Sequence, residues 1–167
     1  MAGNVKAIPE GMHTLTPHLV IRGAAKAIEF YKKAFGAQER SVHKIPDGMV
    51  MHAELKIGDS TVMLADEFPG APCQAPQTAG TTTTVLHLYV DDVDSWFNRA
   101  ASAGATVVMP VMDMFWGDRY GQLKDPFGHL WAIATHKEDV ESGEVERRGA
   151  AMMAEMTKKM RAGTKAS

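Results

Sequence analysis

HLVIRGAAKAIEFYKKAFGA, residues 18–37, is the stretch that decides the fold, because the chain repeats its pattern further on. LHLYVDDVDSWFNRAASAGA, residues 86–105, again places a short apolar strand before an amphipathic helix that ends at Gly-Ala. A second pair of similar segments follows the two helices, HAELKIGDSTVMLAD at 52–66 and YGQLKDPFGHLWAIAT at 120–135. Such a repeat indicates two copies of one supersecondary unit, in the order strand, helix and three strands.

Hydrophobic periodicity predicts the elements of both copies. Strands are expected at 14–22, 38–44, 49–57 and 60–65, and again at 82–90, 106–111, 119–124 and 129–135. The first helix is expected at 24–35, with Gly36 just past its end. Asp91 or Asp92 caps the second helix, which runs to about Ala103. The predicted fold class is α+β, with two tandem βαβββ modules whose curved antiparallel or mixed sheets form a cleft, plus a C-terminal helix.

Composition divides the chain into five segments. They are an N-terminal extension at 1–13, the first module at 14–67, a linker rich in Pro and Gly at 68–81, the second module at 82–137 and a C-terminal tail at 138–167. One face of an amphipathic helix in the tail carries Val145, Gly149, Met152, Met153, Met156 and Met160. A methionine stripe at this spacing is expected to pack on its own fold or on a partner subunit.

Bulk composition excludes several classes of protein. The 167 residues carry a net charge of -2, so the chain lacks the excess of basic residues that is typical of nucleic-acid binding. Apolar runs stay well short of the roughly 20 residues of a membrane helix, and the N-terminus lacks the apolar core of a secretory signal. The single cysteine, Cys73, cannot form an internal disulfide. We therefore expect a cytoplasmic protein that binds neither nucleic acid nor a membrane.

Strand alternation predicts which side chains lie on the sheet face that the helix leaves open. In 50–57, Met51, Ala53, Leu55 and Ile57 belong under the helix, and Val50, His52, Glu54 and Lys56 face the other way. If the two open faces lie side by side, they line one cleft with His18, His52, Glu54, Met63, His87, Trp116, Asp118, Tyr120 and Gln122. Convergent polar groups in such a cleft indicate a small-molecule site. The alternative interpretation is that these are solvated residues on the outer face of an ordinary sheet.

Three segments resemble one known superfamily. They are TPHLVIRGAAKAIEFYKKAFGA at 16–37, HAELKIGDSTVMLADE at 52–67 and FWGDRYGQLKDPFGHLWAIATHKEDV at 115–140. The chain resembles the vicinal oxygen chelate superfamily, which includes glyoxalase I, bleomycin and fosfomycin resistance proteins and extradiol dioxygenases, and in particular its PhnB-like branch. The resemblance covers about residues 14–137. It implies a homodimer, often with modules exchanged between the chains.

The resemblance also implies where a divalent metal would bind. Metal-using members take one His, Gln or Glu ligand from the first and the last strand of each module, and these positions here hold Thr16, Met63, Val85 and Ala132. None of the four is a good ligand, so the usual site is expected to be missing. A displaced site built from His18, His52 and His87, with Glu54 as a further ligand, would suit Zn, Ni or Fe.

Three functions remain open from the sequence. The first is a binding protein of the bleomycin-resistance type, which sequesters a small organic molecule without a cofactor. The second is a lyase, isomerase or oxidoreductase of the glyoxalase or dioxygenase type that uses the displaced metal. The third is a metal-free enzyme with His52 or Glu54 as the general base. In each case the expected partners are a small organic molecule and a second copy of the chain.

Overall fold

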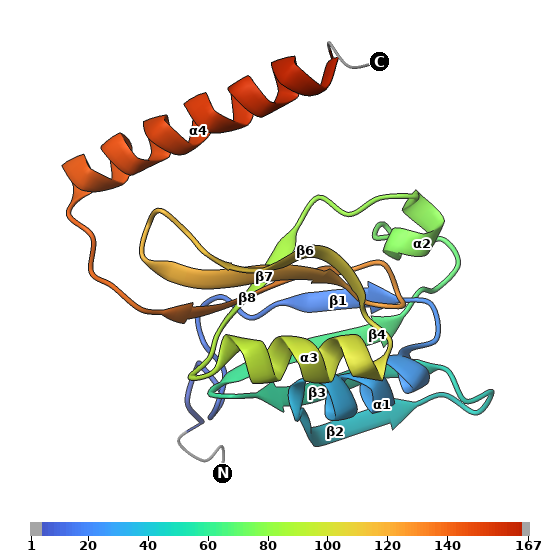
Figure 1. Cartoon of the computed structure of the whole chain (residues 1–167). Helices are drawn as coiled ribbons and strands as arrows, with labels where there is room; N and C mark the ends of the chain where they lie inside the picture. The colour runs from blue at the N-terminus through green and yellow to red at the C-terminus, as the bar shows by residue number, and fades with distance from the viewer. Residues whose placement is uncertain (1–4, 165–167) are drawn as a thin grey trace.

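The computed structural model describes residues 5–164, with side chains as far as Lys158, as two βαβββ modules joined by a linker (Figure 1). The first module consists of β1 (His18–Ile21), α1 (Ala24–Phe35), β2 (Gln38–Lys44), β3 (Val50–Ile57) and β4 (Ser60–Asp66). The second consists of β5 (Val85–Tyr89), α3 (Val93–Ala103), β6 (Thr106–Asp113), β7 (Asp118–Lys124) and β8 (Leu130–His136). The linker contains α2 (Pro76–Ala79), and α4 (Ser142–Thr164) follows the second module. The α+β fold predicted from the repeat is confirmed.

Each module forms one four-stranded mixed sheet, in the orders β1-β4-β3-β2 and β5-β8-β7-β6. β1 runs parallel to β4 and β5 runs parallel to β8, whereas the other neighbours are antiparallel. α1 packs on the first sheet and α3 on the second. Because an amphipathic helix must bury its apolar stripe, one face of each sheet is covered and the other is open.

The ends of both helices follow the signals in the sequence. α1 spans the predicted residues, and Gly36 after it adopts a φ of 64°, which is the left-handed conformation that favours glycine. At the start of α1, the Asp66 carboxylate accepts a hydrogen bond of 2.8 Å from the Ala24 N–H. At the start of α3, Asp92 caps the helix by accepting from the Ser95 N–H at 3.1 Å. The predicted cap on the second helix is therefore confirmed.

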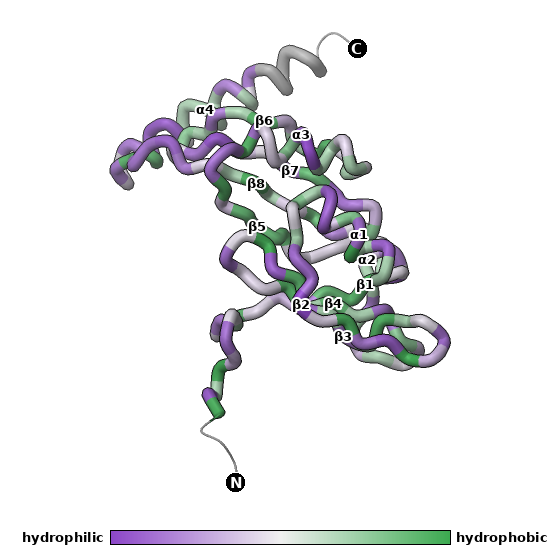
Figure 2. Tube along the Cα trace, turned by 90° about the horizontal axis from the view of Figure 1, so that it is seen from below, coloured by the Kyte–Doolittle hydropathy of each residue, from purple (hydrophilic) through white to green (hydrophobic). Residues whose placement is uncertain are grey.

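The two modules meet through their helices. α1 packs against α3, and the apolar residues of both modules form one continuous core (Figure 1). The ring centroids of Phe35 and Trp131 lie 4.6 Å apart across this junction. Tyr31 donates a hydrogen bond of 2.8 Å from its hydroxyl to Asp125 Oδ2 in the other module. Figure 2 shows the same arrangement from below, with apolar residues along β5. Both sheets therefore turn their covered faces toward the junction and their open faces away from it.

The first strand of each module is shorter than the sequence predicts. β1 begins at His18 rather than at residue 14, although the Pro17 carbonyl already accepts a hydrogen bond from the Met63 N–H at 2.9 Å. Proline has no N–H to donate to a ladder, which favours a strand that begins after it. β5 begins at Val85 rather than at residue 82. The linker, for which no helix was predicted, forms α2 with Pro76 in its first turn.

Two residues at the start of β3 lie on the opposite sides to those predicted. Val50 was expected on the open face but is 0% exposed, and Met51 was expected under the helix but is 55% exposed. The pairing of β2 with β3 is irregular between His43 and Lys44, where Lys44 pairs with Val50. A bulge of this kind shifts the alternation by one residue, so the predicted pattern holds only from His52 onward.

The helix α4 confirms the predicted C-terminal helix and lies on the side of β6 and β7 away from α3 (Figure 1). Arg148 of its second turn donates a hydrogen bond to Glu138 in the segment that precedes the helix. Met153 and Met156, on the predicted stripe, are exposed, whereas Met152 is half-buried. The side chain of Met160 lies outside the described residues. Whether this stripe packs on a partner subunit stays a prediction.

Candidate functional site

Three strands of the second sheet bring aromatic and polar side chains together on the open face. His87 of β5 pairs with Ala132 of β8, which pairs with Gln122 of β7. One step further along, Tyr89, Ala134 and Tyr120 form the next row. Ala132 and Ala134 are fully buried, so the larger side chains on both sides lean over β8. The surface that results is aromatic.

We call this surface the aromatic platform and define it as His87, Tyr89, Trp116 and Tyr120. The ring centroids of His87 and Tyr89 lie 4.6 Å apart, and those of His87 and Tyr120 lie 5.8 Å apart. The Trp116 and Tyr120 rings meet edge to face at 5.6 Å and 76°. Beside them, the Gln122 amide donates a hydrogen bond of 2.6 Å to the Tyr120 hydroxyl. Offset and perpendicular pairs at these separations are favourable for aromatic rings.

A buried carboxylate fixes one end of the platform. Asp118 is only 3% exposed, and its Oδ2 accepts hydrogen bonds of 2.9 Å from both the Tyr89 hydroxyl and the Trp116 N–H. Its Oδ1 lies 2.8 Å from Nδ1 of His136, whose Nε2 lies 3.0 Å from Asp139. Ionised carboxylates only accept hydrogen bonds, so an imidazole between two of them is best satisfied when both ring nitrogens carry protons. The pKa of His136 is accordingly raised, mainly by its hydrogen bonds to Asp118 and Asp139.

Two further pKa shifts set the charges of the platform. Burial alone would raise the pKa of Asp118, but the hydrogen bonds from His136, Tyr89 and Trp116 outweigh it and hold the pKa below its ordinary value. Burial lowers the pKa of His87, against the opposing attraction of Asp118. At neutral pH, Asp118 is therefore a carboxylate and His87 a neutral imidazole.

The open face of the first sheet carries a second group of predicted site residues, which we call the histidine group: His18, His52, Glu54 and Met63. Met63 of β4 pairs with His18 of β1 and with Glu54 of β3. The rings of His18 and His52 lie 5.9 Å apart, and His52 Nε2 is 3.5 Å from Glu54 Oε1. Burial and the neighbouring His52 lower the pKa of His18. His43, which was not predicted, stacks on His52 at 6.4 Å.

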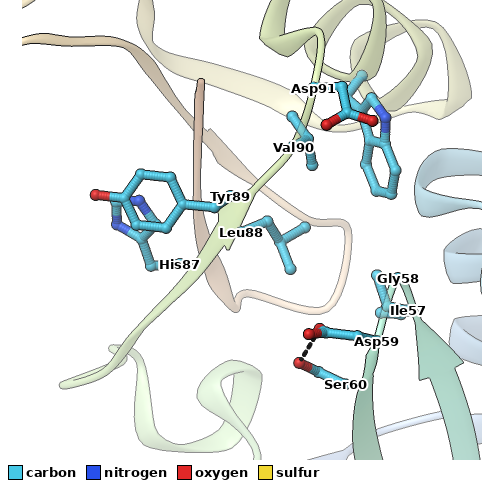
Figure 3. A pocket seen from close by; sticks show the side chains of 10 residues that line it. Ile57, Gly58, Asp59, Ser60, His87, Leu88, Tyr89, Val90 and Asp91 are labelled. Carbon is cyan, nitrogen blue, oxygen red and sulfur yellow. Dashed lines mark hydrogen bonds between the residues drawn. The ribbon is translucent and has the colours of Figure 1, made fainter. Parts of the chain in front are cut away.

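The platform and the histidine group are separate within one chain. A cavity of about 470 Å³ lies between β5 and the turn that joins β3 to β4 (Figure 3). His87 and Tyr89 point away from Gly58 and Asp59 on the far side of this cavity (Figure 3). Among the residues that the structure describes, no hydrogen bond or ring contact joins the two groups. Each group therefore lies on its own open face.

The sequence missed two contributors to the platform network. Alternation along β5 already places Tyr89 on the open face, two residues after His87, but Tyr89 was not named as a site residue. His136 is the last residue of β8 and pairs with Asp118, and its position shares the face of Ala132 and Ala134. Its role depends on the register between β7 and β8, which a sequence without homologues does not reveal.

The four positions at which the family resemblance implies metal ligands offer no good donor set here. Thr16 lies before β1, where its hydroxyl donates to the His13 carbonyl at 3.0 Å. Val85 and Ala132 have no donor atom, and Met63 offers only a soft thioether. Within residues 5–164, no three His, Cys, Asp or Glu side chains are arranged to hold a metal ion. The described residues of one chain thus do not bring His18, His52 and His87 together. Metal analysis of the purified protein tests whether this displaced set binds a metal.

Comparisons with known proteins agree with this architecture. The family model of the Glyoxalase/Bleomycin resistance protein/Dioxygenase superfamily matches residues 12–133. The chain belongs to this superfamily. A relative within it, the uncharacterized protein Rv0887c of Mycobacterium tuberculosis, is 47% identical over 135 residues, which cover 79% of each chain. None of the described helices is long and apolar enough to cross a membrane.

Solved structures of the superfamily share the fold. TioX from Micromonospora is 28% identical with a TM-score of 0.61, over 74% of this chain and 98% of TioX. The PhnB protein from Bacillus cereus has a TM-score of 0.59 at 19% identity, over 74% of this chain and 99% of that protein. The first similarity supports the family and the second shows the fold alone. The PhnB-like resemblance predicted from the three sequence segments is confirmed at the level of fold.

Proposed function

We propose that the protein binds and sequesters a small organic molecule on the aromatic platform. The observation that carries this proposal is the set of ring faces that Asp118 holds in place at the open face of the second sheet. Rings whose polar ends are already bonded lose little conformational freedom when a flat ligand stacks on them. Aromatic walls with a few fixed polar groups are typical of ligand sites in proteins.

The site is completed, in this proposal, by a second copy of the chain. The histidine group of one chain would face the platform of the other, which gives the single cleft expected from the sequence. Val85, Tyr89 and Met112 support this arrangement, because all three are large, exposed residues on the open face of the second sheet. Apolar surface that a sheet leaves exposed commonly marks an interaction site.

Two measurements test these proposals. Size-exclusion chromatography with light scattering gives the mass of the protein in solution. A monomer at all concentrations contradicts the dimer. For the ligand, aromatic compounds are titrated into the protein by calorimetry. Trp116→Leu should weaken binding about tenfold, because aromatic stacking adds roughly 0.5–1.5 kcal/mol beyond area burial.

Trp96→Leu is the matched control for this substitution. Trp96 lies on α3, where Arg99 stacks on its ring at 4.6 Å, and it is not part of the platform. The control should bind as the unchanged protein does. Equal losses in both variants, or no loss in Trp116→Leu, would contradict binding at the platform.

A second candidate function is supported by the histidine group. His52 and Glu54 are half-buried and 3.5 Å apart, a geometry from which one of them could take a proton from a bound substrate. To test it, the compound that binds is incubated with the protein and the mixture is analysed by mass spectrometry. Turnover that Glu54→Gln removes and Glu39→Gln retains would support an enzyme. An unchanged compound would support sequestration alone.

A further inference from the structure

We infer that the ligand of the aromatic platform is a planar organic cation. This inference rests on the proposed function and names the chemical class that the same site would take. It follows from the orientation of the rings and from the charges around them.

The rings present their faces rather than their polar ends. The Tyr89 hydroxyl and the Trp116 N–H both donate to Asp118 Oδ2 at 2.9 Å, so neither donor is free for a ligand. Tyr89 is 65% exposed despite this bond, which leaves its ring accessible. The face of an aromatic ring carries the negative part of its quadrupole, and a cation placed over it is attracted.

The charges at this end of the platform also favour a cation. Asp118 and Asp139 are two carboxylates that share the single imidazole of His136. Even when His136 is protonated, the net charge of Asp118, Asp139 and His136 together is negative. Because Asp118 is buried, solvent screens its charge less than it would screen a carboxylate at the surface.

Besides His136, the basic side chains that β5, β7 and β8 place on this face are His87 and Lys124. His87 is the platform residue that could become cationic, and burial keeps it neutral at neutral pH by lowering its pKa. Lys124 follows Asp118 by six residues on β7, which places the two about 20 Å apart along the strand. A flat cation over Tyr89 and Trp116 therefore meets negative charge, whereas a flat anion of the same size is repelled.

Three probes of similar shape and different charge test the inference. N-methylisoquinolinium is a planar cation, isoquinoline is its neutral counterpart at neutral pH, and 2-naphthoate is a planar anion. Each is titrated into the full-length protein by calorimetry. We expect the cation to bind about tenfold more tightly than isoquinoline, in line with cation–π and buried-charge attraction, and the anion to bind most weakly.

A charge-removing variant locates the source of the preference. Asp118→Asn keeps an oxygen that can accept from Tyr89 and Trp116 but removes the negative charge, so the preference for the cation should fall several-fold while isoquinoline still binds. Asp59→Asn is the matched control, because Asp59 lies in the exposed turn between β3 and β4 and should leave the preference unchanged. If Asp118→Asn does not fold, Tyr89→Leu serves instead, since losing one ring face should also reduce the preference.

The outcomes separate this inference from the proposed function. Equal affinity for N-methylisoquinolinium and isoquinoline overturns the inference of a cationic ligand and leaves the proposal of small-molecule binding in place. Failure of all three probes to bind overturns both. An unchanged preference in Asp118→Asn, or in Tyr89→Leu where the first variant does not fold, also overturns the inference.

Discussion

Replacing Tyr31 by phenylalanine should weaken the junction between the two modules while keeping its packing. Tyr31 is fully buried, and its hydroxyl donates to Asp125 Oδ2 at 2.8 Å. The substitution removes only this hydroxyl, so Phe35 and Trp131 keep their ring contacts. A hydrogen bond to a charged group contributes about 1.5–3 kcal/mol, and we expect a loss of that size in the free energy of unfolding. For a chain of this length the midpoint temperature should fall by about 3–12 °C.

Urea unfolding followed by circular dichroism measures this loss, at one fixed protein concentration because association would add to the apparent stability. Tyr120→Phe is the matched control. Its hydroxyl accepts from Gln122 at the half-exposed platform, where the loss should be about 0.5 kcal/mol or less. If Tyr31→Phe stays within about 0.5 kcal/mol of the unchanged protein, or loses no more than Tyr120→Phe, the hydroxyl does not stabilise the junction and the reasoning is wrong.

Three further predictions concern packing and protonation. Gly121→Ala should lose about 1–3 kcal/mol in urea unfolding. Its new Cβ would lie 2.8 Å from the Phe97 ring, whereas Gly143→Ala, with nothing within 4 Å, should be neutral. Binding of an organic cation should weaken as the pH falls below 6.5, the ordinary pKa of histidine, and His87 gains positive charge at its lowered pKa; a flat titration contradicts this. His136→Gln should destabilise the protein more in acid than in alkali. The raised pKa of His136 gives stability that is present below its ordinary 6.5 and is lost as the pH rises through the folded value; an equal difference at both ends refutes this.

Local signals account for the part of the fold that the sequence could predict. α1 was bounded correctly because its apolar stripe and Gly36 are both visible in the sequence. α3 was bounded by Asp92 in the same way. The facing of Val50 and Met51 was predicted wrongly, because the irregular pairing between Val50 and His52 depends on β2 rather than on either strand alone. α2 was missed since only four residues form it, too few to show a helical period.

The sequence predicted the sheet face of several candidate residues but not how they come together. Alternation along β5 and β7 placed His87 and Gln122 on the open face, where the structure also has them. His136, one partner of Asp118, could not be found this way, because its place opposite Asp118 depends on the register between β8 and β7. The relation between the two open faces depends on how α1 packs on α3, and that packing involves contacts far apart in the sequence.

The union of the two halves depends little on the covalent link between them. Residues 69–74 are all exposed, while the aromatic rings, Asp125 and the helix pair that join the halves are buried elsewhere. We therefore expect a cut in that segment to be tolerated, because exposed loop residues are where chains accept nicks and new termini. The polypeptide is thus suited to division into two fragments within residues 69–74, or to circular permutation with new termini there.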